Sequence, residues 1–259
     1  MRLSHTDLGG EGKPPLVILH GLLGSSRNWW GAGRLLADRH RVLALDLRNH
    51  GGSPHAPEHT IEAMAADVLE TLDALGVSRT ALLGHSMGGK VAMRLAVEKP
   101  DRVEWLIVVD TAPTETPGGA RELEVLSRLD LDPVKSRKEA DAALAREIDD
   151  PVSRQFLLTN LVIGEDGRAT WRVNLPALLA GLPSMRSSNL APGERYGGPT
   201  LFVLGGRSSY TGAEDRASIV AHFPRARIEV IPESGHNPHT ETREKFVETV
   251  LAFGKDGRS

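Results

Sequence analysis

The segment GHSMGG, Gly84 to Gly89, places a serine between glycines where an apolar run ends and a helical pattern begins. A strand, a sharp turn and a helix in this order are typical of a nucleophile elbow, whose strained turn lifts a serine hydroxyl above a sheet. Glycines flank such a serine because the strand and helix backbones pass too close together for side chains. The segment therefore predicts that Ser86 is a nucleophile, and the alternative is a glycine-rich turn with an idle serine.

A serine hydroxyl needs a base to accept its proton near neutral pH, and histidine has a suitable unperturbed pKa. In enzymes with such an elbow the histidine comes last in the chain, after the final strand. His236, in ESGHNPH, directly follows the last strand-like run, so we predict that His236 is the base. The alternative is His239, and the two together also have the H-x-x-H spacing of metal ligands. Further ligands are missing nearby, so we expect no metal.

The tetrahedral intermediate of acyl transfer needs two backbone donors for its oxyanion. One is expected from the residue after the nucleophile, Met87, and the other from a loop after an early strand. The segment HGLLGS, His20 to Ser25, follows such a strand-like run, and its glycines let the backbone turn inward. We predict Leu22 as the second donor, with Leu23 as the alternative. A glycine-rich loop without a catalytic role is the other interpretation.

Two places compete for the acid that orients the histidine. The usual place, just after the strand-like run at residues 200–206, holds no carboxylate before Glu214 and Asp215. Those two lie in the first turn of a predicted helix, where the macrodipole favours acidic residues in any case. The other place is the end of the preceding strand, where an apolar run leads into Asp110 beside the strand that carries Ser86. The carboxyl edge of a parallel sheet is where active sites form, so we predict Asp110, with Asp215 as the alternative.

These residues must be positioned by a sheet and its covering helices. Continuous apolar runs of strand length lie at residues 15–19, 41–45, 80–84 and 105–110, and further strand patterns follow at residues 200–206 and 227–231. Such runs are typical of strands buried on both faces, and they predict a mostly parallel sheet flanked by helices. Helical spacing of apolar residues falls at residues 61–75, 90–97, 213–222 and 243–253. The sequence therefore predicts an α/β fold.

The middle of the chain differs from both ends. Strand-like runs stop after Asp110, and three helical segments follow: RELEVLSRL, RKEADAALAREI and VSRQFLLTNLVI. We therefore expect a helical lid inserted after the strand that ends at Asp110. The predicted division is an α/β core at residues 1–111 and 186–259, with the lid at residues 112–185.

Composition sets limits on function. The chain has 259 residues, 40% of them apolar and 25% charged, and a net charge of −3. It lacks the basic excess of a nucleic-acid-binding protein, so we expect no nucleic-acid partner. It has no cysteine, which excludes thiolate nucleophiles, disulfides and Cys-ligated metals. The sequence shows no signal peptide and no stretch of 18 apolar residues, and we expect a cytoplasmic protein without a membrane partner.

The segments HGLLGS, DLRNHGGS, GHSMGG and SGH occur in an order that resembles the α/β-hydrolase superfamily. The segments VVDTAP, FLLTNL, WRVNLPAL and GGRSSY are similar to those of the small esterases of the bacterial YbfF type and their mitochondrial abhydrolase-domain relatives. The resemblance runs from about Pro15 to Phe253. It implies an α/β-hydrolase fold and a cofactor-free serine hydrolase acting on carboxylic or thioester bonds. Its Asp-x-Ala-Pro motif matches Asp110 to Pro113, and Asn237 departs from the family's more usual Trp or Phe.

The sequence thus predicts a serine carboxylesterase that hydrolyses small-molecule acyl esters of short to medium chain through an acyl-enzyme. The alternatives are a perhydrolase or acyltransferase with the same triad, and a ligand receptor on the same scaffold. Trp29 and Trp30, just past the oxyanion segment, and Trp171 in the lid are candidates to line the pocket, with a place in the core as the alternative. Polar residues of DLRNHGGS are expected to tie a turn together. The oligomeric state stays open.

Overall fold

The computed structural model describes residues 1–116 and 118–256. In these residues a seven-stranded sheet has the order β1-β3-β2-β4-β5-β8-β9. Its strands are β1 (His5–Asp7), β2 (Pro15–Leu19), β3 (Arg41–Leu45), β4 (Thr80–His85), β5 (Val103–Val109), β8 (Thr200–Gly205) and β9 (Ala226–Ile231). β1 pairs antiparallel with β3, and the other strands of the sheet run parallel. The predicted mostly parallel sheet is confirmed. The two edge strands differ from the others, since β1 is short and polar and β9 alternates apolar and charged residues.

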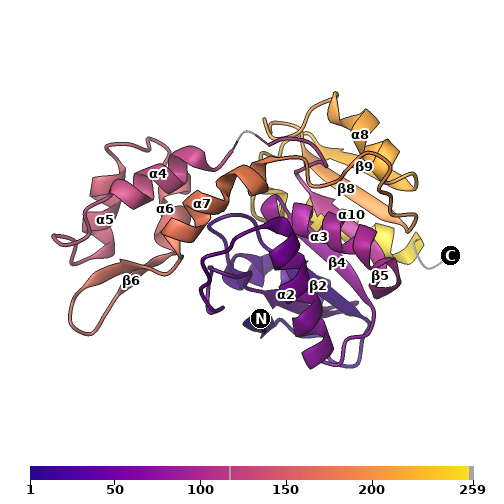
Figure 1. The fold of residues 1–259 in the computed structure, drawn as a ribbon, viewed down its shortest axis with the longest axis horizontal. Helices are drawn as coiled ribbons and strands as arrows, with labels where there is room; N and C mark the ends of the chain where they lie inside the picture. The colour runs from indigo at the N-terminus through magenta and orange to yellow at the C-terminus, as the bar shows by residue number, and fades with distance from the viewer. Residues whose placement is uncertain (117, 257–259) are drawn as a thin grey trace.

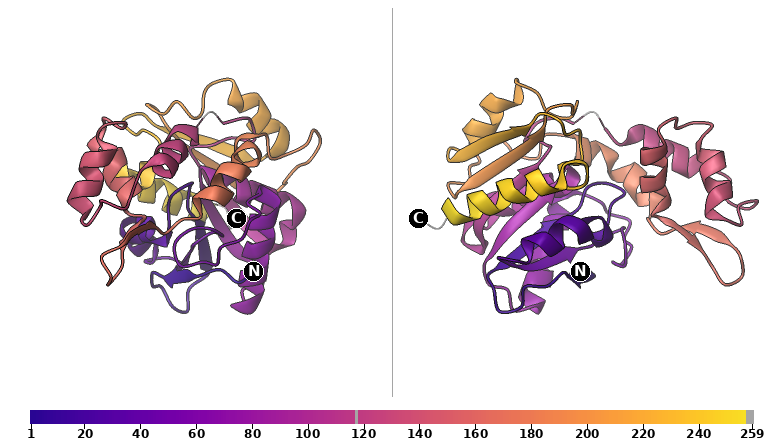
Figure 2. Two further views of the ribbon diagram at one scale, coloured as in Figure 1. Left: turned by 60° about the vertical axis from the view of Figure 1, so that its left-hand side comes forward. Right: turned by 180° about the vertical axis from the view of Figure 1, so that it is seen from behind.

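Helices cover both faces of this sheet (Figures 1 and 2). On one face, apolar side chains of α2 (Ile61–Ala74), α3 (Met87–Glu98) and α8 (Asp215–His222) share a buried cluster with the strands. On the other face, α1 (Trp30–Leu36) and α10 (Arg243–Asp256) share a second cluster. Short helices η1 (Ser26–Trp29), η2 (Pro100–Arg102) and α9 (Pro238–Glu241) connect these elements. In the part of the chain that is described, no helix combines the length and apolarity that crossing a membrane requires.

The chain between β5 and β8 forms a separate lobe at one end of the sheet (Figure 1). It contains α4 (Ala120–Arg128), α5 (Arg137–Leu144), α6 (Pro151–Leu158), β6 (Leu161–Ile163), β7 (Ala169–Trp171) and α7 (Leu175–Arg186). We call residues 120–186 the lid segment. It has its own apolar cluster, to which Leu126, Leu144 and Leu178 contribute. α7 also places Met185 in the apolar cluster of the core, so this helix packs against both the core and the lid segment. The domain boundary between residues 185 and 186 stays a prediction.

The prediction of one helical segment over VSRQFLLTNLVI is wrong at its end. α6 ends at Leu158, and Leu161–Ile163 form β6, which pairs antiparallel with β7. The helix ends because the chain turns back into a hairpin, whose tight turn places Gly167 at φ +74°. An Asp-Gly pair between short runs of strand-forming residues is a hairpin signal. Asp166-Gly167, which lies between LVI and ATW, carries that signal.

Candidate active site

Ser86 lies in the turn between β4 and α3, at the carboxyl edge of the sheet. Its backbone has φ 51° and ψ −118°, a strained conformation for a residue with a side chain. A Cβ at Gly84 would lie 2.2 Å from the Gly88 carbonyl oxygen, and one at Gly88 would lie 2.5 Å from the His20 carbonyl oxygen. Both positions therefore require glycine, and the close approach of strand and helix holds the serine in the turn.

His236 lies in the loop between β9 and α9, and Asp110 directly follows β5. Nδ1–H of His236 donates a hydrogen bond to Oδ2 of Asp110 at 2.7 Å. Asp110 has no solvent-exposed surface, and its Oδ1 accepts from the Gly205 N–H at 2.9 Å. Because Asp110 holds Nδ1, Nε2 is the ring nitrogen left for a proton transfer. Ser86 and His236 line the same cavity, so the arrangement can activate a serine hydroxyl.

The alternative acid, Asp215, lies elsewhere. It accepts hydrogen bonds from the Thr114 hydroxyl at 2.7 Å and from the Gly212 N–H at 2.9 Å. The first contact ties the start of α8 to the chain that leaves β5, and the second holds the turn just before α8. Asp110, and not Asp215, is therefore the carboxylate that the structure brings to His236.

The other histidines near the site serve as supports. The His239 ring stacks on Trp29 with centroids 4.1 Å apart, and burial together with His236 lowers the pKa of His239 to about 3. Nε2–H of His85 donates to the His236 carbonyl at 2.8 Å, so it holds the backbone of the histidine loop. Burial and the neighbouring His236 and His239 lower the pKa of His85 well below its usual range. Among residues 1–116 and 118–256, no group of three potential metal ligands occurs.

The loop after β2 forms a tight turn in which the Gly24 N–H donates to the Gly21 carbonyl at 3.0 Å. The Leu23 N–H donates to Nε2 of His50 at 3.2 Å and is therefore occupied. The Leu22 N–H has no hydrogen-bond partner within the described residues. Met87 begins α3, where N–H groups lack partners inside the helix. Leu22 and Met87 both line the cavity that Ser86 lines.

That cavity has a volume of about 330 Å³ and lies between the core and the lid segment. A volume of this size suits a small-molecule ligand. The core contributes the catalytic candidates and Trp29, and the lid segment contributes apolar side chains from two helices. Those side chains are Phe156, Leu157, Leu182 and Met185.

The three tryptophans predicted as pocket residues lie in different places. Trp29 is 1% exposed and lines the cavity. Trp30 is 55% exposed, with the Arg34 guanidinium 5.5 Å from its ring centroid, and does not line the cavity. Trp171 packs against the apolar cluster of the lid segment, and its Nε1–H donates to the Leu126 carbonyl at 3.1 Å. Of the three, the structure brings only Trp29 to the cavity.

Two residues of the loop after β8 join the site without having been singled out from the sequence. The Ser208 hydroxyl donates to Oδ2 of Asp110. The Tyr210 ring stacks on His236 with centroids 3.7 Å apart and an interplanar angle of 16°. Both belong to the segment GGRSSY. Its position after a predicted strand at the carboxyl edge is the signal that could have identified them.

The fold and the site define an α/β hydrolase. Residues 14–132 match the family model described as the α/β hydrolase fold. The chain is 40% identical to the sn-1-specific diacylglycerol lipase ABHD11 of Mus musculus over 97% of this chain and 84% of that protein. It is 33% identical to esterase YbfF of Escherichia coli over 93% of each chain. A solved structure titled marine microorganism esterase superposes with a TM-score of 0.94 at 34% identity, covering 98% of this chain and 99% of the other. The chain belongs to the α/β-hydrolase family, and it is a hydrolase of the esterase and lipase type.

Proposed function

We propose that the protein is a serine carboxylesterase whose catalytic triad is Ser86, His236 and Asp110. The observation that carries this proposal is the 2.7 Å hydrogen bond from His236 Nδ1 to Asp110 beside a serine in an elbow conformation. A buried carboxylate on Nδ1 fixes the tautomer in which Nε2 can accept the serine proton, and it stabilises the imidazolium that results.

The reaction follows from these roles. Ser86 Oγ attacks the ester carbonyl carbon while His236 Nε2 accepts the hydroxyl proton. The N–H groups of Leu22 and Met87 stabilise the oxyanion of the tetrahedral intermediate. When that intermediate collapses, the alcohol leaves with the proton from His236, and the acyl group stays on Ser86. Water then gives up a proton to His236 and attacks the acyl carbonyl. When this second intermediate collapses, His236 returns the proton to Ser86 Oγ and the carboxylic acid is released.

We propose esters of short to medium acyl chains as substrates. A cavity of about 330 Å³ with an apolar wall from the lid segment supports this size and polarity. A diacylglycerol is the second candidate, favoured by the 40% identity to a protein named as a diacylglycerol lipase. The two candidates differ in whether the acyl chain must extend beyond the cavity.

The test is a hydrolysis profile over p-nitrophenyl acetate, butyrate, octanoate and palmitate, together with a dispersed diacylglycerol and an acyl-CoA. We expect the highest kcat/KM for acetate to octanoate. Preference for dispersed diacylglycerol over every soluble ester would replace the first substrate class with the second. A pre-steady-state burst followed by turnover would distinguish an enzyme from a receptor that holds ligand. Product analysis with added alcohol or peroxide tests acyl transfer and perhydrolysis.

The triad is tested with Ser86→Ala, His236→Ala and the double variant. Each single change should lower kcat by several orders of magnitude, and the two losses should not add because both disable one unit. Folding is checked by circular dichroism. More than about a tenth of wild-type activity in Ser86→Ala would contradict the proposed nucleophile, since loss of a triad serine costs far more than this.

A further inference from the structure

The turn after β2, which lines the cavity, contains a residue in an unfavourable conformation. Leu23 has φ 61°, in the left-handed region that residues with a Cβ rarely adopt. Such a conformation persists only where the surrounding structure fixes it, and it concentrates at functional sites. The Leu23 side chain is 2% exposed and belongs to the apolar cluster of the lid segment. The contacts that fix this turn therefore include the lid segment as well as the core.

The first peptide group of the turn is held by the core. Nδ1–H of His20 donates to the Gly21 carbonyl at 2.8 Å, and the Gly24 N–H donates to the same oxygen at 3.0 Å. Because a trans peptide group is planar, fixing the Gly21 carbonyl also fixes the opposite direction of the Leu22 N–H. This is the N–H that we assign to the oxyanion.

The two peptide groups that flank the Leu23 Cα are held from opposite sides. The Leu23 N–H donates to His50 Nε2 at 3.2 Å, and the Leu23 carbonyl accepts from Asn160 Nδ2 at 2.8 Å. His50 lies in the loop after β3, whereas Asn160 lies between α6 and β6 in the lid segment. Both side chains are buried, with 0% and 2% exposure. Together they fix the φ and ψ of Leu23.

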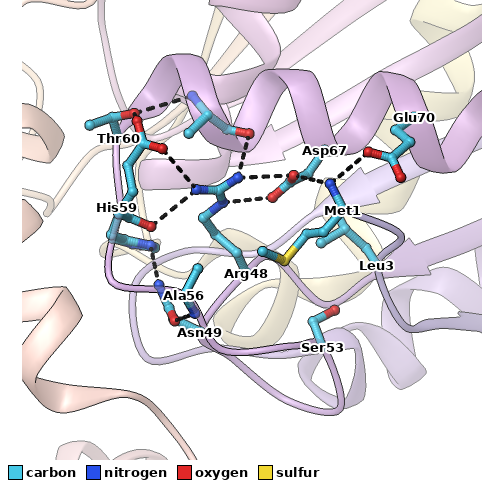
Figure 3. Close-up of polar contacts among 12 residues, drawn as sticks. Met1, Leu3, Arg48, Asn49, Ser53, Ala56, His59, Thr60, Asp67 and Glu70 are labelled. Atoms are coloured by element: carbon cyan, nitrogen blue, oxygen red, sulfur yellow. Dashed lines mark hydrogen bonds and ion pairs between the residues drawn. The ribbon is translucent and has the colours of Figure 1, made fainter.

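The His50 ring is held by a hydrogen bond within its own loop. Its Nδ1–H donates to the Arg48 carbonyl at 2.9 Å, which leaves Nε2 as the acceptor. The Arg48 guanidinium makes two hydrogen bonds to Asp67, at 2.6 and 2.9 Å, and Asn49 contacts His59 at 3.3 Å (Figure 3). Burial, with His20 and His59, lowers the pKa of His50 well below its usual range. The ring is therefore neutral near pH 7 and can accept the Leu23 N–H.

We propose that Asn160 is a positioning residue for the oxyanion hole: it acts from the lid segment, together with His50 from the core, to hold the Leu23 turn that leaves the Leu22 N–H free for the oxyanion. This inference rests on the proposed serine esterase function. It means that the oxyanion hole is complete only while the lid segment is docked on the loop after β2. Asn160 does not line the cavity, so it acts on the reaction through the backbone of Leu22 and Leu23.

The test compares Asn160→Ala and Asn160→Asp with wild type on p-nitrophenyl butyrate. An aspartate has nearly the same shape as asparagine but, when ionised, has no N–H to donate to the Leu23 carbonyl. A misplaced oxyanion donor weakens stabilisation of the transition state and leaves substrate contacts in place. We expect kcat to fall about 10- to 100-fold in both variants, with KM within about threefold of wild type.

The matched control is Asn189→Ala. Asn189 is also a buried asparagine, 4% exposed, and its Nδ2 donates to the Lys90 carbonyl at 2.9 Å, away from the loop after β2. The Asn189→Ala variant should lose about as much thermal stability as Asn160→Ala, while its kcat stays near wild type. Inactivation by a fluorophosphonate, whose phosphoryl oxygen needs the same donors, should slow in the Asn160 variants in parallel with kcat.

Substitutions of His50 provide an independent test of the proposal. His50→Gln keeps a side-chain oxygen that can accept the Leu23 N–H, whereas His50→Leu removes every acceptor. We expect His50→Gln to retain at least about tenfold more kcat than His50→Leu, with circular dichroism confirming that both variants fold. Equal kcat in two folded His50 variants would contradict the proposed role of this contact.

The outcomes separate this proposal from the function on which it rests. If Ser86→Ala abolishes turnover while Asn160→Ala and Asn160→Asp keep wild-type kcat, the positioning role is overturned and the esterase function stands. If KM rises and kcat does not change, Asn160 only shapes the lid segment, and the proposal is again overturned. If wild-type turnover survives Ser86→Ala, the proposed function fails and this proposal fails with it.

Discussion

The hydroxyl of Ser208 donates a hydrogen bond to Oδ2 of Asp110, the oxygen that also accepts from Nδ1 of His236. Ser208 lies in the loop after β8, where enzymes with this elbow usually carry the acid, and Asp110 follows β5. The two strands are adjacent and parallel, so their carboxyl ends meet at one point of the sheet edge. A carboxylate from either strand can therefore reach the same histidine, and this chain supplies it from β5 with a serine at the other place.

The first prediction concerns the identity of the acid. Asp110→Asn should lower kcat by about 10⁴-fold, because the amide favours the wrong tautomer of His236 and does not stabilise its charged form. Asp215→Asn should cost little activity, because Asp215 contacts Thr114 and Gly212 instead of the histidine. Both variants are measured on p-nitrophenyl butyrate after circular dichroism has confirmed folding. The reverse ranking would move the acid to α8.

The second prediction uses the neighbouring strand ends. In an Asp110→Asn background, Ser208→Asp should recover at least about tenfold of the lost kcat. The reason is that the Ser208 hydroxyl already contacts Asp110 Oδ2, and this oxygen lies 2.7 Å from Nδ1 of His236. A carboxylate at residue 208 therefore begins close to the histidine. Steady-state kinetics of the double variant give the answer. Ser208→Asn in the same background is the control, since it has a similar shape without the charge, and recovery there would exclude the electrostatic explanation.

The sequence predicts the sheet and the elbow well because both depend on local patterns. Most of the parallel strands are rich in buried apolar residues, and Ser86 lies between the end of one such strand and the first turn of a helix. The pairing of Asp110 with His236 spans 126 residues. It was still predictable, because the strand end carries a carboxylate and the loop after β8 carries none before Glu214.

Other features depend on packing that a single sequence does not encode locally. Trp29 and Trp30 are identical and adjacent, yet one is 1% exposed and the other 55%. Successive residues of a helix point about 100° apart, and only the placement of η1 and α1 on the sheet decides which ring is buried. The contact from Asn160 to Leu23 spans 137 residues. It depends on how the lid segment docks, which hydrophobic periodicity does not specify.

A third prediction concerns stability in acid. Burial, with smaller effects of Arg48 and His20, lowers the pKa of His59 from 6.5 to about 4. The unfolded chain therefore binds more protons than the folded chain between pH 4 and 6.5, and unfolding becomes easier as the pH falls through this range. Replacing His59 with Gln should reduce the pH slope of the unfolding free energy by up to about 1.4 kcal/mol per pH unit.

This slope is measured from urea unfolding at several pH values between neutral pH and pH 4. His5→Gln is the control, because His5 is exposed on β1 and its ring is solvated in both states. Parallel curves for wild type and His59→Gln would show that His59 does not contribute to the acid sensitivity. The absolute stability of the variant does not enter, because only the slope is compared.

The last prediction concerns the attachment of the lid segment. Lys90 on α3 is 1% exposed, and its Nζ donates to the Thr114, Arg186 and Ser187 carbonyls at 3.0, 3.1 and 2.7 Å. Thr114 lies on the chain that leaves β5, whereas Arg186 ends α7 and Ser187 begins the chain that returns to β8. A single ammonium group therefore ties both connections to the helix that follows Ser86. Burial lowers the pKa of Lys90 to about 8, so its charge is costly there, and the three carbonyls compensate.

Lys90→Met keeps most of the side-chain volume but removes the ammonium donor from three partly buried carbonyls. The Arg186 carbonyl keeps the Thr116 N–H as a donor at 2.8 Å. We expect a loss of about 1–3 kcal/mol of unfolding free energy and faster thermolysin cleavage in the two connections, at residues 111–116 and 187–199. Lys99→Met is the matched control, since Lys99 is exposed at the end of the same helix and should change neither quantity. Unchanged stability in Lys90→Met would mean that removing the desolvated charge offsets the lost hydrogen bonds. Unchanged cleavage would mean that other contacts hold the lid segment in place.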